Sequence, residues 1–65
     1  MKYVKYVCIC GKTHTAPAER QTRGSTLELG MTPCNLPLGL EWHHEGDTYI
    51  LKAVWVKGIR IHIIK

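Results

Sequence analysis

Residues 48–65, TYILKAVWVKGIRIHIIK, decide the fold of this chain. Their β-branched and aromatic residues are typical of strands. Lys57 and Gly58 lie between the two halves as a two-residue turn, in which the glycine supplies positive φ, although Asn or Asp would suit the first position better than lysine. The predicted pairs across the turn are Val56 with Ile59, Val54 with Ile61, and Lys52 with Ile63. The stretch therefore predicts a long C-terminal β-hairpin.

The two faces of this hairpin differ in character, because successive side chains of a strand point to opposite sides. The apolar face carries Ile50, Val54, Val56, Ile59, Ile61 and Ile63. The mixed face carries Leu51, Ala53, Trp55, Arg60, His62 and Ile64. An isolated hairpin is marginal in water, so we expect upstream strands to cover the apolar face.

The upstream sequence offers three further strands, over residues 3–10, 25–31 and 36–44, each with alternating apolar side chains. Between the first two, residues 12–23 are polar, and Pro17 could open one or two turns of helix there; an irregular loop is the alternative. The pattern predicts an all-β fold, a small five-stranded antiparallel barrel or rolled sheet of SH3-like type with at most one short helix.

Length and composition indicate one small soluble domain. The 65 residues are 45% hydrophobic, and no apolar run approaches the length of about 20 residues that a membrane span needs. The N-terminal sequence lacks the pattern of a secretion signal, so we expect a cytoplasmic protein without membrane contact. The formal net charge of +4 is compatible with nucleic acid or an acidic protein as partner.

Cysteine and histidine residues suggest a metal site. Cys8 and Cys10 fall on one face of the first strand, and Gly11 allows the chain to turn back toward His14. Cys34 follows a proline in a predicted turn and would complete a Cys3His set. Such a set suits tetrahedral Zn²⁺, and a structural zinc would help to stabilise so short a chain.

Other interpretations of these cysteines stay open. The run from Cys8 to Lys12 resembles a fragment of a zinc knuckle, with one residue between the cysteines where a knuckle has two. Free cysteine is among the most buried residue types, so Cys8 and Cys10 could be core residues. A redox or disulfide role is a third possibility.

The mixed hairpin face suggests binding rather than catalysis. Trp55 beside Arg60 offers a base-stacking surface next to a cation, as single-stranded nucleic acid requires. The same predicted surface includes Lys52, Lys57, Lys12, Arg20 and Arg23. The alternative is an accessory or inhibitor protein, of phage type, that blocks a partner protein through the same residues. We expect no enzymatic activity, because no catalytic set can be assembled from the sequence. We also expect a monomer or, through open strand edges, a homodimer.

Overall fold

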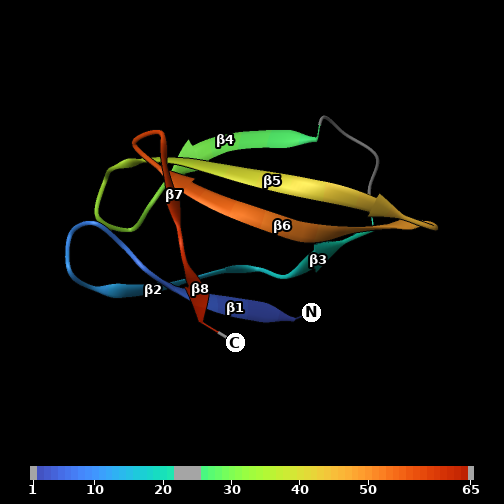
Figure 1. Ribbon diagram of the computed structural model, residues 1–65, viewed down its shortest axis with the longest axis horizontal. Helices are drawn as coiled ribbons and strands as arrows, with labels where there is room; N and C mark the ends of the chain where they lie inside the picture. The colour runs from blue at the N-terminus through green and yellow to red at the C-terminus, as the bar shows by residue number, and fades with distance from the viewer. Residues whose placement is uncertain (1, 22–25, 65) are drawn as a thin grey trace.

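The computed structural model describes residues 2–21 and 26–64, and this part of the chain is built from antiparallel strands without a helix (Figure 1). The strands are β1 (Tyr3–Val7), β2 (Thr13–Pro17), β3 (Glu19–Arg20), β4 (Leu27–Met31), β5 (Pro37–Glu45), β6 (Thr48–Val56), β7 (Ile59–Ile61) and β8 (Ile63–Ile64). No helix that could cross a membrane occurs among these residues.

The strands form two sheets that face each other. The smaller sheet has the order β2-β1-β8, and the larger has the order β3-β6-β5-β4, with β7 also paired to β6 (Figure 1). The prediction of a small all-β, barrel-like fold is confirmed. The chain divides into more and shorter strands than the five predicted, because it passes between the sheets after β2 and again after β7.

The tight turn of the C-terminal hairpin is confirmed. Lys57 and Gly58 have φ values of 52° and 76°, so both turn residues adopt the positive φ of a type I′ turn. Two predicted pairs are also observed, Val56 with Ile59 and Val54 with Ile61.

The predicted pairing of Lys52 with Ile63 is wrong. The hairpin ladder ends at Ile61, and the chain then crosses to the smaller sheet. In β8, Ile63 lies opposite Tyr6 and Ile64 lies opposite Lys5. Ile61 and Ile63 both pack against the core from these positions, so the crossing joins the two sheets along one side.

A β-bulge interrupts the pairing of β5 with β6. Glu41 lies opposite Ala53 and Trp42 lies opposite Leu51, so Lys52 is an extra residue in β6. Because of the extra residue, side chains that would share a sheet face in a regular strand point to opposite faces before and after the bulge.

The bulge decides which residues of β6 are buried. Val54 and Val56 are fully buried, and Leu51 and Tyr49 pack against the same core from beyond the bulge. Ile50 lies on the opposite face and is 37% exposed. The prediction that Ile50 shares the buried face with Val54 is therefore wrong.

The core lies between the two sheets. Its buried members are Tyr6, Cys8, Ala16, Leu40, Trp42, Val54 and Val56. Leu40 and Trp42 are the inward residues of β5 and are 8% and 3% exposed.

Residues 13–20 form strands instead of the short helix or loop that the sequence suggested. In β2, the exposed Thr13 and Thr15 alternate with the partly buried His14 and the buried Ala16. Pro17 lies at the end of β2, which is an edge strand. Proline has no backbone N–H, and an edge strand tolerates this because it pairs with a neighbour on one side only. The alternation was present in the sequence, but the polar composition concealed it.

Candidate metal centre

The loop between β1 and β2 holds two of the candidate ligands. The backbone N–H of Cys8 donates to the carbonyl of Lys12 at 2.9 Å, and that of Gly11 donates to the carbonyl of Cys8 at 3.0 Å. Gly11 has a φ of 88°, a conformation that glycine adopts without steric cost. This closed turn returns the chain so that Cys10 lies beside His14 at the start of β2.

A second closed loop, between β4 and β5, presents Cys34. The N–H of Thr32 donates to the carbonyl of Leu36 at 2.8 Å, and the N–H of Leu36 donates to the Thr32 hydroxyl at 3.0 Å. Asn35 adopts a φ of 63° and donates its N–H to the Thr32 carbonyl at 2.9 Å. Thr32 is buried, so this loop is anchored to the body of the domain and not only to its own strands.

The two loops belong to different sheets, yet their donor atoms meet. The Sγ atoms of Cys8, Cys10 and Cys34 and a ring nitrogen of His14 all lie within 4.8 Å of one another. The Cys34 Sγ is 2.9 Å from the Cys10 Sγ and 2.7 Å from His14 Nε2, and the last two atoms are 3.6 Å apart.

These separations are close to those of a tetrahedral site. Zinc–sulfur bonds of about 2.3 Å and zinc–nitrogen bonds of about 2.0–2.1 Å imply donor separations of roughly 3.5–3.8 Å. A metal ion would require the closest atoms to move apart by less than about 1 Å. The cluster can therefore bind a metal, and it contains all four residues that the sequence indicated.

The thiols of Cys10 and Cys34 share a proton unequally. A hydrogen bond from the Cys34 thiol lowers the pKa of Cys10 to about 6. The same hydrogen bond raises the pKa of Cys34 to about 11. The cluster thus favours one thiolate, and a bound cation would favour deprotonation of the remaining thiols.

The surroundings fix the ligands to different degrees. Cys8 is 2% exposed and belongs to the core, so the core interpretation and the ligand interpretation both apply to it. Tyr6 lies opposite His14 across β1 and β2, with its ring edge-on at 6.0 Å. Burial raises the pKa of Tyr6, which keeps its phenol neutral beside the thiols. Cys10 is the exposed member of the set.

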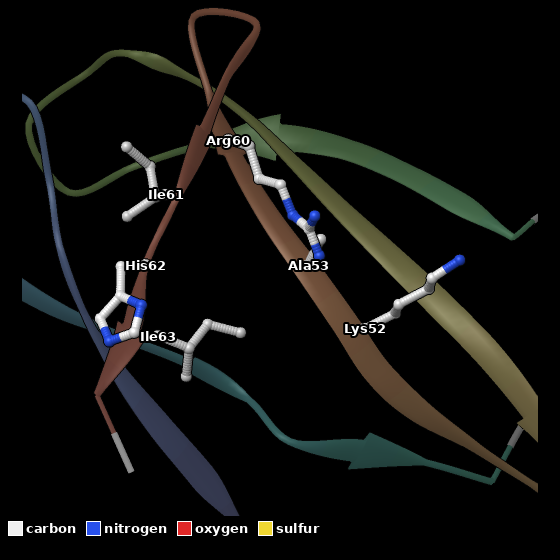
Figure 2. A pocket seen from close by; sticks show the side chains of 6 residues that line it. All are labelled: Lys52, Ala53, Arg60, Ile61, His62 and Ile63. Carbon is white, nitrogen blue, oxygen red and sulfur yellow. The ribbon is translucent and has the colours of Figure 1, made fainter.

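Four of the residues predicted to bind nucleic acid lie in the region of the C-terminal hairpin. Trp55 is directly opposite Arg60, and Figure 2 shows the Arg60 side chain extending along β6 toward Ala53. Lys52 places its Nζ 3.5 Å from a carboxylate oxygen of Glu41, and Lys57 occupies the turn.

Two of the other three predicted residues are described by the structure. Lys12 lies in the loop that carries Cys10, and Arg23 falls outside the described residues. Arg20 is turned inward: its guanidinium lies 5.0 Å from the ring centres of both Trp42 and Tyr49 and pairs with the carboxylate of Glu28. Arg20 therefore packs against core aromatic rings, and the binding role predicted for Lys12 stays a prediction.

Sequence reasoning missed an apolar groove beside Trp55. Leu27 and Leu29 of β4 line it together with Gly39 of β5. The groove could have been suspected from Gly39, because a glycine within a strand often marks a place where another group approaches closely.

The sequence matches no family model, and no significant similarity to a curated protein or to a solved structure was found. Inferences about function therefore depend on the geometry of this chain alone.

Proposed function

We propose that this chain is a zinc-binding β domain, with the ion held by the Sγ atoms of Cys8, Cys10 and Cys34 and a ring nitrogen of His14. The main supporting observation is that four donor atoms, from the β1–β2 loop, the start of β2 and the β4–β5 loop, lie within 4.8 Å of one another. Thiolate and imidazole donors in a compact tetrahedral arrangement favour zinc over magnesium or calcium, which prefer oxygen ligands.

The proposed role of the ion is structural. Four protein ligands fill a tetrahedral coordination shell and leave no position for a reactive water. The ion would connect the β1–β2 loop of one sheet to the β4–β5 loop of the other. A domain of 65 residues has a small core, which gives limited stability. A metal link between the two loops would add to it.

The test is the metal content and stability of protein purified under reducing conditions. We expect one zinc per chain by native mass spectrometry, with a large fall in the melting temperature on chelation. Cys34→Ser and His14→Ala should lose the ion, whereas His62→Ala, an exposed histidine away from the cluster, should retain it. A folded, metal-free chain that takes up neither zinc nor cobalt would overturn the proposal. So would a chain lighter by two hydrogens, which would indicate a Cys10–Cys34 disulfide.

We further propose that the domain acts by non-catalytic binding through the sheet surface that carries Trp55 and Arg60. Support comes from their direct cross-strand pairing, since tryptophan and arginine are enriched at binding hot spots. Nucleic acid and acidic protein would both be attracted to Arg60. The choice between them depends on the apolar residues next to Trp55.

A further inference from the structure

The larger sheet has an outer face, which we define as the surface carrying Leu29, Gly39, Trp55 and Arg60. These residues are consecutive cross-strand neighbours on β4, β5, β6 and β7, so they share one side of the sheet. The opposite side carries Leu40 and the rest of the core. The outer face is thus the side turned away from the smaller sheet.

This outer face exposes a concentration of apolar side chains. Leu29 is 82% exposed, Met31 is 56% exposed and Leu27 is 47% exposed, all on β4. Exposed apolar side chains gathered on one strand, with a tryptophan two strands away, are typical of a surface that meets another protein.

Gly39 makes a groove in this surface. A Cβ atom at Gly39 would lie 3.5 Å from the Trp55 Cβ, 3.6 Å from Leu27 Cδ1 and 3.8 Å from Leu29 Cδ2. The missing side chain therefore leaves a hollow of about 480 Å³ with tryptophan on one side and leucines on the other. Its size and apolar walls suit one or two apolar side chains of a ligand.

Positive charge lies next to the groove, where the Arg60 side chain extends along β6 toward Ala53 (Figure 2). Arg60 is the next cross-strand neighbour after Trp55, and Lys57 occupies the turn beside Gly58, which lines the groove. The carboxylate of Glu41, which also lines the groove, already pairs with Lys52. An occupant with an acidic side chain next to its apolar anchor would meet complementary charge here.

We propose that the outer face binds a short extended segment of a partner protein, with an apolar anchor over Gly39 and an Asp or Glu at Arg60. This inference rests on the proposed binding function and adds the chemistry of the partner. Strands lie about 4.8 Å apart, so Gly39 and Arg60 are separated by about 10 Å. An extended chain covers that distance in about three residues. Side chains on the same side of an extended chain are two or four positions apart, so the partner motif is an apolar residue with an acidic one two or four positions before or after it.

The groove favours a protein segment over nucleic acid. Surfaces for single strands combine several stacking rings with a basic groove that follows the phosphates. Among the residues that the structure describes, Trp55 is the one aromatic residue lining the groove, and apart from Glu41 the rest of the lining is aliphatic, proline or glycine. A second copy of the chain is disfavoured by charge, because each copy carries a formal net charge of +4.

The experiment is a selection of random extended heptapeptides on the immobilised, zinc-supplemented protein. We expect enrichment of peptides with an apolar residue and an Asp or Glu two or four positions apart. Gly39→Leu, which fills the groove, should weaken the selected peptides by about tenfold or more, as expected for loss of a central anchor. Val7→Glu, which changes an exposed apolar residue of the smaller sheet, should leave binding unchanged.

A charge reversal separates docking from loss of fold. Arg60→Glu should weaken the acidic peptides and strengthen the same peptides carrying lysine in place of the acid. The proposal would be overturned if the selected peptides bound the Gly39→Leu and Arg60→Glu variants as tightly as the unchanged protein. Two other results would also overturn it: salt-sensitive binding of oligothymidylate that needs Trp55, without peptide binding, and a dimer that Leu29→Glu dissociates. Zinc content is measured separately by mass, so failure of the metal site and failure of the groove give different results.

Discussion

Replacing Arg20 with alanine should destabilise the domain by about 1.5–3 kcal/mol, although sequence patterns placed this residue on a binding loop. The Arg20 side chain is 14% exposed, and its guanidinium lies 5.0 Å from the ring centres of Trp42 and Tyr49. Two partly desolvated cation–π contacts contribute about 1–2 kcal/mol together. The ion pair with Glu28, whose side chain is 45% exposed, adds about 0.5–1 kcal/mol.

The assay is urea and thermal unfolding, followed by tryptophan fluorescence, at a fixed zinc concentration so that the metal contribution stays constant. A loss of this size should lower the melting temperature by roughly 6–24 °C. Lys5→Ala, which removes an exposed cation from β1, should change stability by less than about 0.5 kcal/mol. A loss for Arg20→Ala no greater than for Lys5→Ala would refute the reasoning. Arg20→Met, which keeps an apolar side chain over the rings without the charge, should recover part of the loss.

Two further predictions concern the hairpin turn and the metal site. Lys57→Asn should raise the urea midpoint, by a few tenths to about 1 kcal/mol in stability, because asparagine tolerates the φ of 52° at this position better than lysine; an unchanged midpoint would contradict this. Zinc affinity, measured by competition with a chromophoric chelator, should weaken as the pH is lowered from about 8 to about 6, because the ion must displace protons from the thiols. Affinity independent of pH over this range would indicate that thiols are not the ligands.

The hairpin could be predicted near its turn and not beyond it. Lys57 and Gly58 encode the turn locally, because a two-residue turn and the alternation on either side set the register for the first pairs. The bulge at Lys52 has no such local signal. Its effect is to bury Leu51 in place of Ile50, and the sequence around it alternates acceptably in either register. Long-range packing against the smaller sheet decides between the two.

The metal cluster could be predicted because its chemistry is specific and its members lie in or next to turns. Cysteine and histidine have few roles, and Gly11 signals that the chain reverses between Cys10 and His14. Arginine has many roles by contrast. The inward orientation of Arg20 depends on Trp42 and Glu28, which are brought to it by strands distant in sequence. A charged residue in a polar stretch gives no sign of such a partner.

The apolar groove and the proposed zinc site are linked through stability, because this small domain places some of its apolar residues on its surface and not in its core. Leu29 and Met31 lie on the outer face, where they bury little surface on folding and contribute little to stability. A chain of 65 residues that keeps such side chains outside has fewer for its core. The proposed zinc site lies at the end of the same strand, through the loop that carries Cys34, and would stabilise β4 without using apolar side chains. On this view the metal permits an exposed binding strand, and loss of zinc should loosen β4 and reduce partner binding together.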